Sequence, residues 1–251
     1  MQKEQTTTSD ASAEYSVGDS PFGRIAVMND VPDGFAVFYT TSDFDGRLTG
    51  GVALQMTSFI HARFGIRSSL TTCTQVHGTT AVRAQHANEW RECDSCDALW
   101  SAERHVALGI KVADCLPVAM IDPTHEVMAN VHSGWRGTVQ RITASTLDSL
   151  EQSTLFDARD AFAYLGPAIR LCCFEVGEEV ASQFDSSYVD RSYDKPHVNV
   201  ARLTIDLLRA RGFRDERIHD SQLCTRCEGS IFHSYRRGRT PGERNLAILA
   251  H

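Results

Sequence analysis

Apolar runs of strand length alternate along this chain with longer segments that have helical periodicity. The longest clean apolar runs, such as LPVAMI at 116–121, are about as long as one buried strand, whereas residues 50–66 and 137–152 repeat apolar side chains along one helical face. This alternation predicts an α/β fold: a single domain with a mixed β-sheet flanked by helices. Loops beyond strand ends hold ligands in such folds, so we expect the active site at strand ends.

The organisation of the chain follows from its length and its ends. A chain of 251 residues fits one large α/β domain, and we expect residues 21–251 to form a single catalytic domain. Residues 1–20 are polar throughout and are predicted to be a disordered tail. They lack the apolar segment of a secretory signal, and no run approaches the about 18 apolar residues of a membrane helix. We therefore expect a soluble cytoplasmic protein with no membrane partner.

The charge balance bears on the class of partner. Lys and Arg number 25 against 32 Asp and Glu, so the net charge is −7. Nucleic-acid-binding domains usually carry a basic surplus, and we expect no nucleic-acid partner here. The basic segment SYRRGR at 234–239 is a local exception.

Three residues of metal-binding type lie where strand-like runs end. They are His77, Cys115 and His132. Imidazole nitrogens and a thiolate suit Zn²⁺, and three protein ligands would leave a fourth position open, as in catalytic zinc sites. Spacing alone leaves the ordinary alternatives open, because a histidine often serves a turn and a free cysteine is often buried in a core.

The corner VHSGWRG at 131–137 joins one of these residues to a possible anion site. Arg136 lies between two glycines and ahead of a predicted helix, where free N–H groups and a guanidinium suit phosphate or carboxylate. Trp135 has two possible roles, stacking on a base or packing in the core, and its large apolar area favours the core.

Seven motifs occur in an order that resembles one known family. They are QVHG (75–78), DAL (97–99), VADCLPV (112–118), VHSGWRG (131–137), LGPAI (165–169), CCFEVGEEV (172–180) and FHSYRRGRTPGERNLAIL (232–249). Together they resemble the polyphenol oxidase or laccase-domain family, whose members are described as purine nucleoside phosphorylases that also deaminate adenosine. The resemblance runs from about Phe35 to Leu249.

The resemblance implies a site with one catalytic zinc ion. Its ligands would be His77, Cys115 and His132, and its substrates would be purine nucleosides and phosphate. Phosphate would attack the ribose C1′ and release the base, and water would attack the purine C6 in deamination. The candidate catalytic residues are Asp114, Cys115 and Glu175, and the candidate substrate- or phosphate-binding residues are Gln75 and Arg136.

Two other functions remain open at the level of the sequence. The older family label suggests a copper-dependent polyphenol oxidase, but none of the ten histidines forms a His-x-His pair and few further copper ligands are available. Bacterial members have also been linked to peptidoglycan editing, which would make the protein a cytoplasmic factor acting on cell-wall precursors.

The chain also departs from the family pattern. Ser42 stands where the family usually has an arginine, and Arg47 is a conceivable substitute. The pairs Cys93/Cys96 and Cys224/Cys227 have the spacing of a structural zinc site. Residues 97–223 separate the two pairs, too many for a compact zinc ribbon, so we expect free thiols and no second zinc. Cys172 is expected to pack in the core, and the role of Cys173 is left open.

Overall fold

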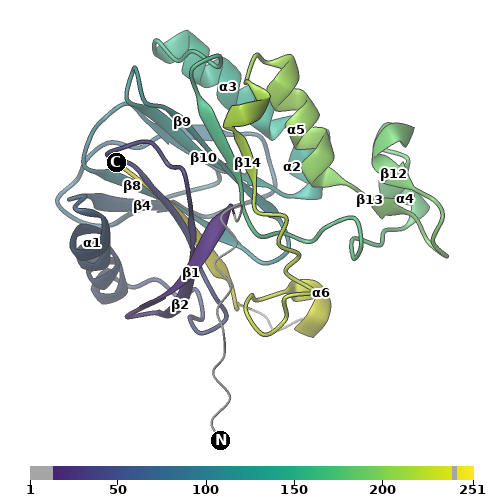
Figure 1. Cartoon of the computed structure of the whole chain (residues 1–251), viewed down its shortest axis with the longest axis horizontal. Helices are drawn as coiled ribbons and strands as arrows, with labels where there is room; N and C mark the ends of the chain where they lie inside the picture. Colours follow the sequence, from purple (N-terminus) through teal and green to yellow (C-terminus); the bar gives the residue numbers. More distant parts are fainter. Residues whose placement is uncertain (1–13, 239–241) are drawn as a thin grey trace, which may run out of the picture.

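The computed structural model describes residues 14–238 and 242–251, whose strands form two large sheets (Figure 1). The seven-stranded sheet has the order β1-β2-β3-β15-β8-β4-β6. Its strands are β1 (Tyr15–Ser20), β2 (Gly23–Met28), β3 (Ala36–Thr40), β4 (Ser69–Cys73), β6 (Arg91–Cys93), β8 (Val106–Val112) and β15 (Asn245–Ala250). It is mixed, because β4 pairs in parallel with β6 and β8 and the other pairs are antiparallel.

The six-stranded sheet has the order β14-β11-β9-β10-β7-β5. Its strands are β5 (Ala81–Arg83), β7 (Ala98–Ser101), β9 (Leu116–Asp122), β10 (Val127–Ser133), β11 (Phe162–Leu165) and β14 (Ile218–Asp220). A small two-stranded sheet consists of β12 (Val189–Asp190) and β13 (His197–Val198). The α/β class is confirmed, but the expected single mixed sheet is in fact two large sheets packed face to face.

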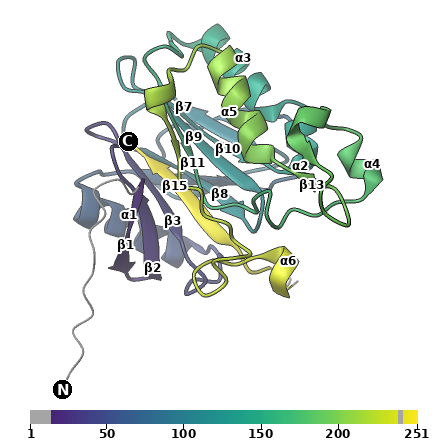
Figure 2. The same ribbon diagram turned by 45° about the vertical axis from the view of Figure 1, so that its right-hand side comes forward.

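The described residues form six α-helices. They are α1 (Gly50–Phe64), α2 (Trp135–Val139), α3 (Ile142–Ser153), α4 (Glu178–Ala181), α5 (Val200–Ala210) and α6 (Tyr235–Gly238), with short 3₁₀ turns at Ser186–Tyr188 and Asp215–Arg217. Figure 2 shows α3 and α5 over the six-stranded sheet, while α1 lies on the far side of the seven-stranded one. The layers therefore run helix, sheet, sheet, helix.

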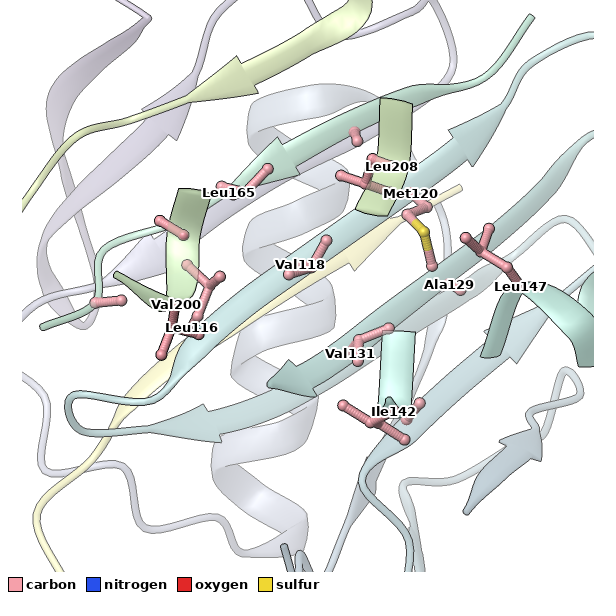
Figure 3. Close-up of a cluster of buried hydrophobic side chains, with 14 of the residues drawn as sticks. Leu116, Val118, Met120, Ala129, Val131, Ile142, Leu147, Leu165, Val200 and Leu208 are labelled. Atoms are coloured by element: carbon pink, nitrogen blue, oxygen red, sulfur yellow. The ribbon is translucent and has the colours of Figure 1, made fainter. Parts of the chain in front are cut away.

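Apolar side chains fill each of the three interfaces between these layers. Leu108, Ile121 and Leu249 belong to the cluster between the sheets. Figure 3 shows the cluster under α3 and α5, in which Met120 and Leu147 are fully buried. Because strands of both sheets are buried on two faces, they read as continuous apolar runs rather than as alternating patterns.

One expected helix differs from the structure. The helix expected over residues 137–152 is two helices, because Arg141 adopts a left-handed conformation (φ 68°) between α2 and α3. After β11, helix α4 begins at Glu178, and Glu175 forms an isolated β-bridge with His197.

The expected N-terminal tail, residues 1–20, lies only partly within the described residues. Residues 1–13 fall outside them, but Tyr15–Ser20 forms β1, which pairs with β2 in a hairpin. A polar edge strand of this kind carries little apolar patterning, which is why its sequence resembles a tail. Within residues 14–238 and 242–251, no helix combines the length and apolar character needed to cross a membrane.

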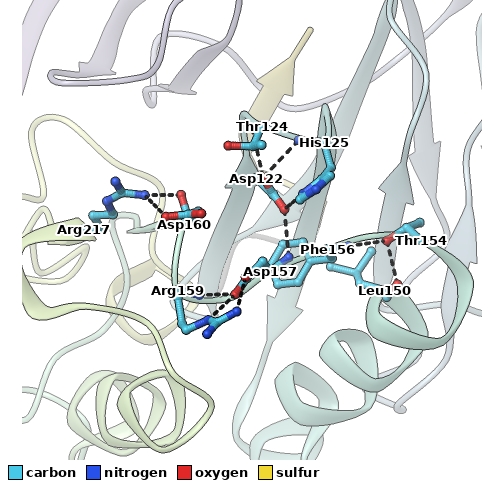
Figure 4. Close-up of polar contacts among 10 residues, drawn as sticks. All are labelled: Asp122, Thr124, His125, Leu150, Thr154, Phe156, Asp157, Arg159, Asp160 and Arg217. Carbon is cyan, nitrogen blue, oxygen red and sulfur yellow. Dashed lines mark hydrogen bonds and ion pairs between the residues drawn. The ribbon is translucent and has the colours of Figure 1, made fainter.

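A polar cluster fixes one end of β9 (Figure 4). The Asp122 carboxylate accepts backbone N–H bonds from Thr124, His125 and Asp157. This ties the β9–β10 turn to the segment that leads into β11. The other end of β9, at Leu116, is the end next to Cys115.

Candidate metal centre and cavity

The candidate site lies where the chain passes from one sheet to the other. β8 ends at Val112 in the seven-stranded sheet, and β9 begins at Leu116 in the six-stranded sheet. Asp114 has φ 83°, a left-handed conformation that is uncommon for a residue other than glycine. Cys115 lies in this tight connection between the two sheets and lines the adjacent cavity.

His77 and His132 reach the same point from different elements. His77 lies in the loop after β4 and has φ 61°. His132 is the last residue but one of β10, which ends at Ser133. The potential ligand atoms of His77, Cys115 and His132 all lie within 4.8 Å of one another. The Cys115 Sγ is 3.9 Å from His77 Nε2, and the two imidazole rings are 4.9 Å apart at 76°. The three residues singled out from strand ends therefore converge.

Asp97 positions His77 and His132 through hydrogen bonds. Its Oδ1 lies 2.7 Å from His132 Nδ1, and its carboxylate accepts backbone N–H bonds from Val76, His77 and Gly78. The Asp97 side chain is fully buried. A carboxylate on the outer nitrogen of a histidine fixes the ring so that its other nitrogen faces a metal, an arrangement that recurs around zinc.

Gly134 leaves the space that the three residues share. A Cβ at this position would lie 2.9 Å from His77 Cδ2 and 3.1 Å from Cys115 Sγ. Its φ of −68° is one that any residue adopts, so the glycine is required by close approach and not by backbone conformation. The donor set, the buried carboxylate and this cradle together fit a metal ion.

The electrostatics of the group match a thiolate facing imidazole donors. Burial raises the pKa of the Cys115 thiol, but the neighbouring His132 and His77 rings outweigh it and lower that pKa to about 6. Burial lowers the pKa of His132, while Cys115 and Asp97 raise it to about 9. Burial raises the pKa of Asp97, but the hydrogen bonds from His132 and Gly78 lower it overall. A metal ion needs the thiolate that this environment favours.

The group opens into a cavity of about 590 Å³. Its walls carry the aromatic side chains Trp135, Phe174 and Tyr235 and the cations Lys111, Arg136, Arg236 and Arg244. Arg136 is exposed and stacks over the Trp135 ring, with its guanidinium carbon 4.4 Å from the ring centroid. No carboxylate among the described residues forms an ion pair with it. Trp135 is partly buried against the core under α3 and also lines the cavity.

Two other candidate residues line the cavity but are already engaged. Asp114 accepts a hydrogen bond from Thr225 Oγ1 at 2.6 Å and another from the Arg236 backbone N–H at 2.7 Å. The Gln75 amide donates to the Lys111 carbonyl and accepts from the Lys111 N–H, so it continues the β4–β8 pairing. Both contacts stabilise the cavity wall.

Glu175 does not reach the cavity. Its carboxylate pairs with Lys195 on the surface, which lowers the pKa of Glu175, and it is absent from the lining residues. Arg47 also lies elsewhere, paired with Asp45 with most of its side chain exposed. The Glu175 role expected from the family motif is therefore not supported by its position, and Arg236 and Arg244 supply cations at the cavity instead.

Sequence reasoning assigned no role to Asp97, Tyr235, Arg236 or Arg244. All four lie in motifs that carried the family resemblance, DAL and the long C-terminal segment. The motifs were a sufficient signal for position, but only the fold shows that Asp97 faces His132 and that Arg236 faces the cavity.

The remaining cysteines are not arranged as the two CxxC spacings suggest. Cys224 and Cys227 gather with Cys172 and Cys173, whereas Cys96 lies beside Cys73. Cys172 is exposed, so the expectation that it packs in the core is wrong. All eight cysteines are free thiols in this structure.

Comparison with solved structures supports the fold. A hypothetical protein of Bacillus licheniformis, YfiH, superposes with a TM-score of 0.79 at 21% identity, covering 92% of this chain and 97% of that one. YlmD of Geobacillus stearothermophilus gives a TM-score of 0.76 at 22% identity, covering 90% and 96%.

Comparison with known sequences places the chain in a family. A purine nucleoside phosphorylase of Pseudomonas aeruginosa is 35% identical over 174 residues, 67% of this chain and 69% of that protein. One of Clostridium acetobutylicum is 35% identical over 153 residues, and the chain spans 63% of its length. An adenosine deaminase from an unknown prokaryotic organism is 32% identical over 153 residues, which are 57% of this chain and 58% of that protein. The family model described as multi-copper polyphenol oxidoreductase laccase matches residues 52–250, so the chain belongs to that family.

Proposed function

We propose that this protein is a zinc-dependent purine nucleoside phosphorylase that also deaminates adenosine. The observation that carries the proposal is the convergence of His77, Cys115 and His132 at a cavity that is also lined by Arg136, which pairs with no carboxylate in the described part of the chain. Relatives named for these two activities support the same substrate class.

The donor set favours zinc. Two imidazoles and one thiolate suit Zn²⁺, and three protein ligands leave one position open. A zinc ion held there would act as a Lewis acid and make water more acidic. The chain's own residues do the rest: Asp97 fixes the His132 ring, and Gly134 keeps the space clear.

The cavity wall provides for the two substrates. The Arg136 guanidinium would bind phosphate through charge-assisted hydrogen bonds, and Tyr235 and Phe174 would contact the purine. In phosphorolysis a phosphate oxygen bonds to C1′ while the bond from C1′ to the base nitrogen breaks. The departing base takes up a proton, which dihydrogen phosphate or water supplies and which Asp114 would relay. Asp114 is the sole carboxylate among the cavity-lining residues that the structure describes.

A multicopper oxidase would need a different set of ligands. Such enzymes bind several coppers through many histidines. Among the described residues only two groups could hold a metal, and only the group of His77, Cys115 and His132 contains histidine. One such group fits a single ion. Thiol ligands also fit the reducing cytoplasm, where we place the protein.

Metal analysis with product assays tests the proposal. Purified protein should carry zinc and should convert adenosine and inosine to free base and ribose 1-phosphate only when phosphate is present. Adenosine without phosphate should yield inosine. Cys115→Ala should lose the metal of this site and both activities, and Cys93→Ser is the matched control. Full activity in Cys115→Ala, or oxidation of phenols with copper bound instead, would overturn the assignment.

A further inference from the structure

A second group of side chains that could bind a metal ion lies outside the cavity. We call it the four-cysteine cluster, and its members are Cys172, Cys173, Cys224 and Cys227. Cys172 and Cys173 lie in a turn after β11, and Cys224 and Cys227 lie in a turn after β14. The four Sγ atoms all lie within 4.8 Å of one another.

The spacing of these sulfurs matches a tetrahedral thiolate site. The Sγ of Cys227 is 3.8 Å from that of Cys172 and 3.4 Å from that of Cys173. A zinc ion with Zn–S bonds of about 2.3 Å separates its sulfurs by about 3.8 Å. Both of these distances lie close to that value, and no pair among the four sulfurs is more than 4.8 Å apart.

The backbone around the cluster is held in place by contacts that do not depend on a metal. Cys224 forms a β-bridge with Ala168, and the Thr225 N–H donates to the Ala168 carbonyl. The Arg170 guanidinium donates to the carbonyls of Gly166 and Leu223, one on each side. The two turns therefore face each other as parts of one fixed structure.

Backbone N–H groups of Arg170, Arg226 and Cys227 donate hydrogen bonds to the Cys224 sulfur. They fix this sulfur in its place beside the other three.

We propose that the four-cysteine cluster binds one structural zinc ion, distinct from the ion of the cavity. Four thiolates complete a tetrahedral shell and leave no open position, which is the composition of structural rather than catalytic zinc sites. The two CxxC pairs of the sequence do not combine; the Cys224 and Cys227 pair takes the adjacent cysteines Cys172 and Cys173 as its partners.

This ion would brace the wall of the cavity. Thr225, next to Cys224, donates to the Asp114 carboxylate, and Phe174, next to Cys173, lines the cavity. Arg237 Nη1 donates to the Thr225 carbonyl, which joins the cluster to the segment that carries Arg236. Loss of the ion should therefore loosen the cavity wall without removing any ligand of the cavity metal.

The test uses full-length protein and removes the two metals one at a time. Wild-type protein should contain two zinc ions per chain, Cys115→Ala one, Cys227→Ser one, and the double variant none. Cys93→Ser, in the other CxxC pair, is the control and should retain two. Chelation should lower the melting temperature of Cys115→Ala but leave that of the double variant unchanged.

Cobalt substitution gives a readout that does not require the cysteine variants of the cluster to fold. Cys115→Ala loaded with Co²⁺ should show the strong thiolate-to-cobalt and visible bands of tetrahedral thiolate coordination. Absence of both zinc and this spectrum in Cys115→Ala would overturn the proposal. So would the loss of two free thiols through a bond between Cys173 and Cys227 in protein purified under reducing conditions. Neither outcome bears on the metal of the cavity.

Discussion

Asp97 Oδ1 and His132 Nδ1 lie 2.7 Å apart in a part of the protein from which solvent is almost excluded. The same carboxylate accepts three backbone N–H bonds from the loop that carries His77. One acidic side chain therefore sets both the orientation of the His132 ring and the position of His77. The geometry of the candidate metal centre depends on a residue that does not itself face the cavity.

Asp97→Asn should weaken metal binding. The amide keeps the size of the side chain but cannot accept all four hydrogen bonds, and loss of a carboxylate behind a histidine ligand typically costs about 10–100-fold in metal affinity. A buried donor left unpaired adds about 1–3 kcal/mol of destabilisation. Competition with a chromophoric chelator measures the affinity. The control is Asp94→Asn, an exposed residue of the same loop, and equal affinities for the two variants would contradict the role of Asp97.

Gly134→Ala should displace the ligands without straining the backbone. The added methyl group would lie 2.9 Å from His77 Cδ2, well inside the about 3.5–4.0 Å at which carbon atoms pack. We expect loss of the cavity metal and of both activities. Gly18→Ala is the control, because a Cβ at Gly18 meets nothing within 4 Å. Retention of metal and activity in Gly134→Ala would show that the cradle is looser than its geometry indicates.

Arg136→Ala should separate the two reactions. Each charge-assisted hydrogen bond to phosphate contributes about 1.5–3 kcal/mol, so phosphorolysis should fall by about one to two orders of magnitude. Deamination needs no phosphate and should fall less. The melting temperature should stay unchanged, because Arg136 is exposed and pairs with no carboxylate among the described residues. Its control is Arg47→Ala, outside the cavity; equal losses in both rates would argue against a phosphate contact.

Asp114→Asn should test proton transfer. A general acid or base typically contributes about 10²–10⁴-fold, so kcat for phosphorolysis should fall by at least about 100-fold. An amide can still pair with Thr225 and the Arg236 N–H, so metal content and melting temperature should be retained. Glu175→Gln, on the surface, should change kcat less than about threefold. A fall in melting temperature that accounts for the lost activity would make Asp114 a positioning residue only.

Local pattern in the sequence determined the α/β class and singled out His77, Cys115 and His132 as candidate metal ligands, but it left other roles open for each of them. Apolar runs define buried strands because both faces must leave water, and the positions of His77 and Cys115 just past such runs follow directly. The resemblance of seven motifs added the family. These features depend on residues close together in the chain, so one sequence suffices to find them.

Tertiary structure alone decided how distant residues meet. The approach of Asp97 to His132 and the grouping of Cys172 with Cys227 each join residues tens of positions apart. β8 and β9 are neighbours in the chain, yet they enter different sheets because each pairs with strands from distant parts of the sequence. Tertiary structure also decided the position of Glu175. The family resemblance implies a catalytic role for this residue, but the fold places its carboxylate on the surface. Such contacts depend on how the two sheets pack against each other. That packing is set by the burial of apolar side chains over the whole core, which the spacing of neighbouring residues does not encode.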